Sequence, residues 1–145
     1  MKIKRLPLNT QGRDYVVGDI HGCFHLVHRE LLRIGFNPKC DRLISVGDLV
    51  DRGPESCQVS DFLELPWVHA IRGNHEQIYI DLYSDNAITR KGSVDYLTQH
   101  QQDRGWWFAL SEQDRLACVD AFNQLPLVIE LETPDGPVGI VHAEV

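Results

Sequence analysis

The chain has 145 residues, of which 43% are hydrophobic and 24% are charged, and its formal net charge is −7. This length and this composition are ordinary for one globular domain, which we place at residues 1–145. The acidic balance argues against binding to nucleic acid or to an anionic membrane, since both partners need a basic protein surface.

Three short apolar runs predict strands in the first half of the chain. After residues 1–13, which read as a polar arm or an edge strand, the runs cover residues 15–17, 42–46 and 67–71. Apolar residues at helical spacing follow each run. They predict a helix over residues 24–34 with Gly35 just past its end, a helix opened by Pro54, and a helix around residues 78–83. We therefore expect an α/β fold.

The second half of the chain is less regular. Residues 85–104 are polar and show no clear period, so no element is predicted there, and an aromatic cluster follows at residues 105–108. Ser111 is a candidate N-cap with Asp114 at the third helical position, which predicts a helix to about Gln124. Two alternating runs, residues 127–133 and 138–141, flank a Gly-containing turn and predict a hairpin.

The chain contains no apolar run long enough to span a membrane, and its first residues lack a signal-peptide core. Its four cysteines have no Cys-x-x-Cys spacing, which argues against a zinc ribbon or a dithiol redox motif. Free thiols are typical of a reducing compartment. We therefore expect a cytoplasmic protein with no membrane partner.

Chemically active side chains follow all three predicted strands of the first half. In a parallel α/β sheet the carboxyl ends of the strands are where ligands bind, so these groups converge if the strands are neighbours. Carboxylate, imidazole and amide oxygen are ligands of hard to borderline divalent metals. The groups are Asp19 and His21 after the first strand, Asp48, Asp51 and Arg52 after the second, and Arg72, Asn74 and His75 after the third.

The ordered triple Gly-Asp-Ile-His-Gly (residues 18–22), Gly-Asp-Leu-Val-Asp-Arg-Gly (residues 47–53) and Arg-Gly-Asn-His-Glu (residues 72–76) resembles the motifs of calcineurin-like metallophosphoesterases. Within them it is most similar to the Ser/Thr protein phosphatases of the bacterial and bacteriophage lambda type. The resemblance extends from about Asp14 to Glu144. It implies an α/β metallophosphoesterase β-sandwich with flanking helices, in four layers of α/β/β/α type.

The resemblance also implies a dinuclear metal centre. Asp19, His21 and Asp48 would hold one divalent ion, Asp48, Asn74 and His142 would hold the other, and Asp48 would bridge them. The ligand set favours manganese, with iron and zinc as alternatives. Such a pair clamps an in-line displacement at phosphorus and supplies a hydroxide nucleophile.

By the same resemblance, Arg52 and Arg72 bind phosphate oxygens, His75 is the general acid, and Asp51 orients the His75 ring. Glu76 reads as a structural partner of nearby backbone. Taken singly, each group has an ordinary alternative, such as a turn, a surface ion pair or an edge histidine, and only the ordered set favours a site. The remaining histidines, His25, His28, His69 and His100, are not expected to be ligands, and Trp106 and Trp107 are expected to pack in the core or in a lid.

Two departures from the family pattern stand out. Residues 101–105 replace an Asn-Gly-Gly-type segment, which leaves substrate contacts there open and suggests Arg104 as a phosphate or acidic-peptide contact. The family pattern also continues beyond the segment of His142 with an arginine and a Gly-His-Thr-Pro motif, whereas this sequence stops at Val145. We therefore expect an incomplete sandwich, a weaker second metal site, and self-association through the exposed apolar edge near Val141.

The function expected from these observations is metal-dependent hydrolysis of phosphate monoesters, with phosphoserine and phosphothreonine in proteins as the main substrates and small phosphoesters as others. One alternative is a bis(5'-nucleosyl)-tetraphosphatase-like hydrolase. Another, from a different class, is a catalytically weak metal-binding remnant that acts through protein contacts.

Overall fold

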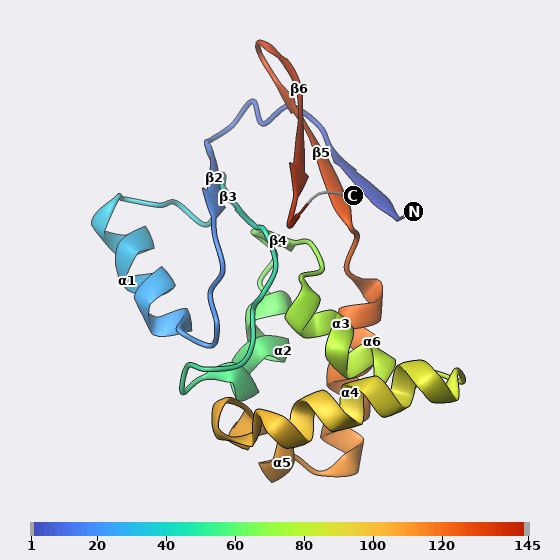
Figure 1. Cartoon of the computed structure of the whole chain (residues 1–145). Helices are drawn as coiled ribbons and strands as arrows, with labels where there is room; N and C mark the ends of the chain where they lie inside the picture. The colour runs from blue at the N-terminus through green and yellow to red at the C-terminus, as the bar shows by residue number, and fades with distance from the viewer. Residues whose placement is uncertain (1, 144–145) are drawn as a thin grey trace.

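The computed structural model describes residues 2–143, so Met1, Glu144 and Val145 lie outside the described residues. Within this range the chain forms two three-stranded sheets with helices around them (Figure 1). None of the helices that the structure describes combines the length and the apolar character needed to cross a bilayer.

The first sheet contains the three strands predicted in the first half of the chain, in the order β2-β3-β4 and all parallel. In this register Val17 pairs with Ser45 and Ser45 pairs with Ala70, so the three strands end level with one another. The condition for the groups at their ends to converge, that the three strands are neighbours, is therefore met. The strands are β2 (Asp14–Val17), β3 (Arg42–Ser45) and β4 (Val68–Ala70).

The second sheet has the order β1-β5-β6, with β1 parallel to β5 and β5 antiparallel to β6. The N-terminal arm is thus an edge strand, and the predicted hairpin is confirmed, with Gly136 in its turn at a φ of +115°. Val141 is 40% exposed at the end of the hairpin, and self-association through this edge stays a prediction. The strands are β1 (Ile3–Leu6), β5 (Val128–Thr133) and β6 (Gly136–Val141).

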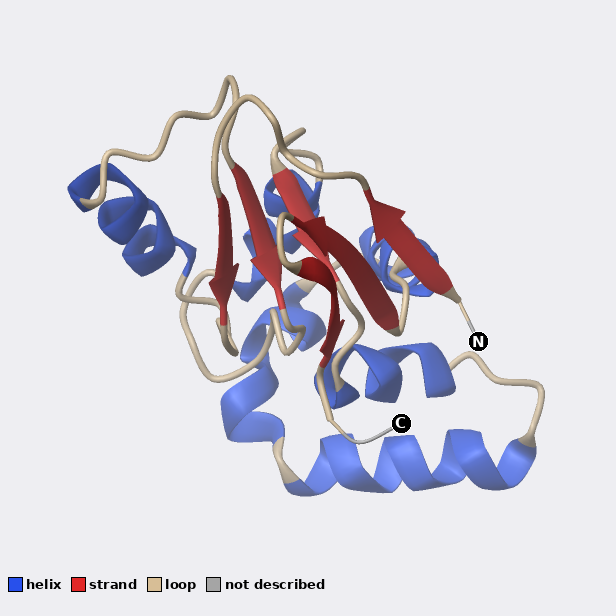
Figure 2. Cartoon of the chain, turned by 90° about the horizontal axis from the view of Figure 1, so that it is seen from above, coloured by secondary structure: helices blue, strands red, loops and turns tan. Residues whose placement is uncertain are grey.

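Apolar side chains of the two sheets share one buried layer, and helices pack on the other face of the first sheet, behind the strands in Figure 2. Ile44 of β3 meets Ile129 of β5 and Ile140 of β6 in the apolar layer between the sheets. Leu43 and Val68 point the opposite way, into the larger core shared with the helices. Alternation along each strand produces these two layers. Residues 2–143 therefore form a helix–sheet–sheet arrangement, and the fourth layer implied by the resemblance is not seen within them.

The helices of the first half agree with the sequence in position but not in every boundary. The first, α1 (Phe24–Arg33), ends before Gly35, whose φ of +72° is the left-handed conformation expected there. Pro54 does not open α2 (Val59–Leu63), because the 3-10 turn η1 (Ser56–Gln58) precedes that helix. The third helix, α3 (Asn74–Asp81), begins earlier than predicted, inside the third motif.

The stretch with no predicted element is mostly helical: α4 (Ala87–Gln99), η2 (Gln101–Arg104) and α5 (Gly105–Ala109). Helical periodicity was not visible because, apart from Leu97, the apolar side chains of α4 are not the buried ones. Ile88 is 85% exposed, whereas Ser93 is buried. The N-cap was a usable signal, since the Asn86 side chain accepts hydrogen bonds from the N–H groups of Ile88 and Thr89.

The last helix, α6 (Glu112–Gln124), is confirmed together with its cap, because the Ser111 side chain accepts a hydrogen bond from the Asp114 N–H. Val119 and Phe122 lie in the core, whereas Leu116 is 44% exposed.

Candidate functional site

The loops at the carboxyl ends of β2 and β3 hold strained backbone. Within residues 2–143 four non-glycine residues have positive φ, namely His21 (46°), Asp48 (51°), Asp51 (74°) and Arg52 (69°). All four are predicted site residues. Such conformations are costly and persist only where the surrounding structure enforces them, and they cluster at functional sites. Here the Asp48 carbonyl enforces the arrangement by accepting the N–H groups of Ile20 and His21 at 3.1 and 2.9 Å.

Glu76 joins the second and third motif loops. Its fully buried carboxylate accepts the N–H groups of Asp48, Leu49 and Gly73 at 3.0, 2.7 and 2.8 Å. A Cβ on Gly73 would lie 2.2 Å from Asp48 Oδ1, so only glycine allows the loops to approach this closely. Burial raises the pKa of Glu76 above its ordinary value despite these donors. The structural role expected for Glu76 agrees with these contacts.

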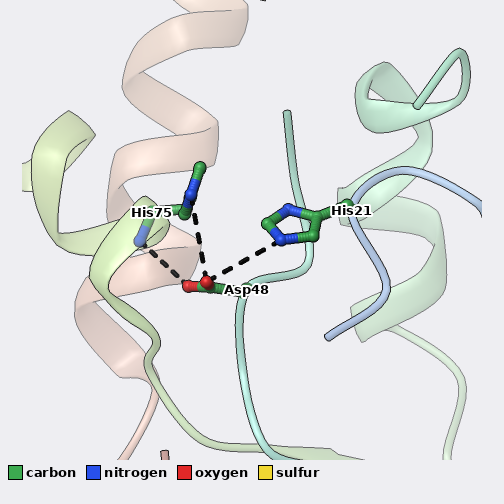
Figure 3. Close-up of side chains that lie close together, drawn as sticks. All are labelled: His21, Asp48 and His75. Atoms are coloured by element: carbon green, nitrogen blue, oxygen red, sulfur yellow. Dashed lines mark hydrogen bonds and ion pairs between the residues drawn. The ribbon is translucent and has the colours of Figure 1, made fainter. Parts of the chain in front are cut away.

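Asp48 lies at the centre of the site and is 5% exposed. Figure 3 shows His21 and His75 approaching its carboxylate from different sides. Nε2 of each ring is 3.9 Å from Asp48 Oδ2. The main-chain N–H of His75 donates to Asp48 Oδ1 at 3.0 Å. A third ring, that of His142, places Nε2 3.5 Å from Oδ1. Three imidazoles therefore converge on one carboxylate.

The three rings are anchored in the same way. Nδ1 of His21 lies 3.0 Å from the Val50 carbonyl, and Nδ1 of His142 lies 2.8 Å from the Val46 carbonyl. A carbonyl only accepts, so each Nδ1 donates its proton there, and in the neutral tautomer each Nε2 presents a lone pair to Asp48. His75 Nδ1 lies 2.7 Å from a carboxylate oxygen of Asp51 in the same manner. Metal-binding histidines are oriented in this way, by a second partner on the far nitrogen.

The donor atoms fit a divalent metal. His142 Nε2 is 2.9 Å from Asn74 Oδ1 as well as 3.5 Å from Asp48 Oδ1, so in the neutral tautomer its lone pair faces two oxygen atoms. A proton on Nε2 would relieve the contact with these oxygen atoms. A metal cation would relieve it too, and the carboxylate of Asp19 could bind the same cation. In each of two groups the possible ligand atoms all lie within 4.8 Å of one another; the groups are His21, Asp48 and His75, and Asp19, Asp48 and His142.

These groups differ in membership from the two ligand sets implied by the resemblance. Asp48 is common to both groups, as a bridging ligand must be. Asp19 lies between the groups, with one oxygen 3.9 Å from His21 Nε2 and the other 3.9 Å from His142 Nδ1. His75 stands beside His21, and Asn74 stands beside His142. All five predicted ligands are thus brought together, while their division between two ions stays a prediction.

Asp51 is fully buried and faces the back of the His75 ring. Burial by itself would raise the pKa of Asp51, but hydrogen bonds from His75, Tyr79 and Trp106, together with the charge of Arg104, bring it below the ordinary value. Asp51 is therefore held as a carboxylate. This geometry agrees with the expected role of orienting His75.

Arg52 lies beside His21, and Arg72 lines the same cavity as Asn74 and His142. Arg52 is exposed, and its Nη1 donates to His21 Nε2 at 3.0 Å. Arg72 is half-buried, and it donates to Gln77 Oε1 at 3.0 Å and to the Asn123 carbonyl at 3.2 Å. Burial lowers the pKa of Arg72. Cavities of about 440 Å³ and 260 Å³ lie beside Arg52 and Arg72 respectively.

The hypothesis that Arg104 contacts phosphate or an acidic peptide is wrong. Its side chain is 1% exposed and forms an ion pair with Asp51, with Nε 3.2 Å from Oδ2. The sequence analysis also missed Tyr79, whose hydroxyl donates to Asp51. Tyr79 lies one helical turn after His75, so the i, i+4 spacing was a usable signal. Trp107 packs in the core as expected, whereas Trp106 also donates to Asp51 at 2.8 Å.

The other histidines are placed outside both groups of possible ligand atoms, among the described residues. His25 and His28 are exposed on α1, and His25 pairs with Glu55 at 2.9 Å. His69 is half-buried on β4, and His100 is exposed at the end of α4.

Comparisons with known proteins agree with this geometry. A family model described as calcineurin-like phosphoesterase matches residues 13–144. Serine/threonine-protein phosphatase 2 of Salmonella typhimurium is 36% identical over 134 residues, which are 90% of this chain and 57% of that protein. The symmetrical bis(5'-nucleosyl)-tetraphosphatase of Shewanella sp. (strain ANA-3) is 33% identical over 133 residues, which are 90% of this chain and 44% of that protein.

Among solved structures, a protein proposed to be a diadenosine tetraphosphatase superposes with a TM-score of 0.69 at 27% identity, over 99% of this chain and 55% of that one. The chain thus spans about half the length of the curated relatives that it matches. The relatives fall into two activity classes at similar identity.

Proposed function

We propose that this chain, which belongs to the calcineurin-like phosphoesterase family, hydrolyses phosphate monoesters, with phosphoserine and phosphothreonine in proteins as its substrate class. The observation that carries the proposal is the convergence of Nε2 of His21 and Nε2 of His142 on Asp48, next to His75, whose far nitrogen is held by the buried Asp51. This arrangement offers ligands for two ions and a proton donor within one site.

Asp19, His21, Asp48, Asn74 and His142 would hold the two ions. When bound, they supply a hydroxide near neutral pH and stabilise charge on the transferred phosphoryl group. We favour manganese because the donor set is oxygen and nitrogen.

His75 would act on the leaving group. Its Nδ1 is committed to Asp51, so Nε2 is the atom that can carry a proton to a departing alkoxide. The Asp51 carboxylate stabilises the imidazolium that delivers this proton. General acid catalysis of this kind contributes about 10²–10⁴-fold to the rate.

Arg52 would bind the substrate. Its guanidinium now donates to the Nε2 lone pair that a metal would take, so it can turn to phosphate oxygens once Nε2 is a ligand. The cavity of about 440 Å³ at its side, which Pro54, Trp106 and Leu110 help to line, can take the group next to the phosphate.

The distribution of cations favours one phosphoryl group over a chain of four. A dinucleoside tetraphosphate carries several negative charges and needs several accessible cations. Around the centre, within residues 2–143, Arg52 is exposed, but Arg72 already donates to a backbone carbonyl and Arg104 is buried against Asp51. The net charge of −7 adds repulsion.

The test is phosphate release by the 145-residue chain with added manganese. Substrates are a phosphoserine peptide, a phosphothreonine peptide, an aryl phosphate and diadenosine tetraphosphate, and Asp48→Asn is the matched control. We expect the peptides and the aryl phosphate to be hydrolysed faster than the tetraphosphate. A preference for the tetraphosphate would favour the other activity class among the relatives. Manganese binding without any turnover would favour a metal-binding protein instead.

A further inference from the structure

The Asp51 carboxylate has four polar neighbours, two at each oxygen. Oδ1 accepts hydrogen bonds from the Tyr79 hydroxyl and from Trp106 Nε1. Oδ2 lies 2.7 Å from His75 Nδ1 and 3.2 Å from Arg104 Nε. His75 and Tyr79 come from α3, Arg104 from η2 and Trp106 from α5. The carboxylate cannot rotate without breaking contacts at both oxygens.

Arg104 is unusual among these neighbours because it is a charged side chain with 1% exposure. Nε is within ion-pair distance of Oδ2, but its N–H does not point along a hydrogen bond, so the pairing is one of charge. Nη1 donates to the His100 carbonyl at 3.3 Å, and the guanidinium lies 4.8 Å from the centre of the Tyr96 ring. The guanidinium is therefore fixed by α4 and turned toward Asp51.

Arg104 belongs to residues 101–105, the stretch that departs from the family pattern. The structure places this departure behind Asp51, where a buried carboxylate needs a counter-charge. Asp51 also has strained backbone, with a φ of +74°, and its N–H donates to Ser56 Oγ at 2.9 Å.

We propose that Arg104, with Tyr79 and Trp106, is a positioning group that fixes the Asp51 carboxylate and through it the ring of His75. The catalytic consequence rests on the proposed function, whereas the effect on the His75 ring does not. Because Arg104 and His75 share Oδ2, the guanidinium holds that oxygen in place and keeps it charged while the imidazole is neutral. His75 Nδ1–H then has one fixed acceptor, and Nε2 stays directed at Asp48.

The competing explanation is that Arg104 only stabilises the fold. That role predicts a lower unfolding temperature on substitution, with His75 unchanged in the molecules that remain folded. The two explanations therefore differ in the state of the His75 ring.

The variants are Arg104→Met, which removes the charge, and Arg104→Lys, which keeps it. Arg115→Met is the matched control, because Arg115 packs over Trp107 at 5.6 Å and donates to its carbonyl at 3.0 Å without contacting Asp51. The first measurement is the NMR spectrum of the imidazole nitrogens of the metal-free chain at one alkaline pH, with His75 assigned through His75→Asn. We expect one tautomer, protonated at Nδ1, in the unmodified chain, in Arg115→Met and in Arg104→Lys, and mixed tautomers in Arg104→Met. An unchanged His75 signal in Arg104→Met would overturn the proposal.

The second measurement compares kcat for an alkyl and an aryl phosphate. We expect Arg104→Met to slow the alkyl substrate about tenfold more than the aryl substrate, since only the alkoxide needs the proton. In an Asp51→Asn background the same substitution should have no further effect. Equal slowing of both substrates, or full slowing in that background, would contradict a role through Asp51.

The two measurements fail separately. If the unmodified chain hydrolyses none of these substrates, the proposed function is wrong, and the NMR experiment still decides the role of Arg104. If Arg104→Met does not fold, Tyr79→Phe removes one donor from Oδ1 with little change in packing. Tyr79→Phe should then give mixed tautomers of the His75 ring to a smaller extent than expected for Arg104→Met. An unchanged His75 signal in Tyr79→Phe would count against the proposal.

Discussion

The His21 and His142 sides of the Asp48 carboxylate use the same anchor but differ in charge. Each ring donates Nδ1–H to a main-chain carbonyl two residues from Asp48, that of Val50 or Val46. His21 Nε2 then meets a donor of the protein itself, Arg52 Nη1 at 3.0 Å, whereas His142 Nε2 meets two acceptors. The protein thus places a cation of its own on the His21 side and two oxygen atoms on the His142 side, where we propose that an external cation binds.

This difference opposes the order of affinity expected from the resemblance. The resemblance favours the set of Asp19, His21 and Asp48 as the tighter site. The charges in the structure favour the His142 side, because a metal there displaces no arginine. We expect the His142 side to bind first.

The largest effect is expected from Asp48→Asn, which removes the carboxylate that both sides share. Manganese affinity should fall more than about 100-fold on both sides, since each loses a direct ligand. Atomic emission on the dialysed protein measures the content before and after substitution. Loss of one equivalent alone would show that Asp48 serves only one side.

His75→Asn tests whether the residue beside His21 is a ligand or an acid. If His75 is the acid, its loss should slow hydrolysis of alkyl phosphates by about 10²–10⁴-fold. Hydrolysis of aryl phosphates should slow far less, because aryl groups leave without a proton. Metal content should hardly change. A lost equivalent of manganese would place His75 among the ligands of the His21 side.

The order of binding is tested by His142→Ala and His21→Ala, each the control for the other. Calorimetric titration with manganese should show the tighter binding event lost in His142→Ala and the weaker one lost in His21→Ala, each by about 10–100-fold. The reverse assignment would restore the order expected from the resemblance.

Arg52→Met sharpens the comparison further, since it removes the cation that occupies the His21 lone pair. Affinity on the His21 side should rise several-fold, while KM for a phosphopeptide should also rise because a phosphate donor is lost. Arg90→Met on α4, whose side chain donates to the Ser84 carbonyl, is a control that should change neither value. An unchanged affinity would mean that the guanidinium does not compete with the metal.

The smallest effect concerns His69, a half-buried imidazole outside the centre that accepts a hydrogen bond from Lys4 Nζ at 3.0 Å. Burial and the charge of Lys4 lower its pKa from 6.5 to about 4. The unfolded chain therefore takes up this proton as pH falls below 6.5, before the folded chain does, so stability should decline between pH 6.5 and 4.

Solvent screens a half-exposed side chain, so we expect a loss of at most about 1–2 kcal/mol from this residue. Urea unfolding at several pH values, with and without His69→Gln, measures it. The substitution should flatten the decline, and an unchanged slope would show that His69 does not cause it.

The sequence by itself determined the parts of this protein that depend on local chemistry. A β-branched run ended by glycine and charge specifies both a strand and the side chains at its tip, so β2, β3, β4 and the predicted ligands followed from short segments. The caps of α1 and α6 and the hairpin turn are equally local, since a few adjacent residues satisfy their backbone groups.

Only the tertiary structure decided what depends on contacts between distant segments. Arg104 reads as a surface contact in the sequence, and only the packing of η2 behind the second motif loop makes it the buried partner of Asp51. The ring of His142 is oriented by a carbonyl 96 positions earlier in the chain. Local sequence predicts neither the burial of a charge nor the tautomer of a histidine, because each depends on the groups that folding brings near it.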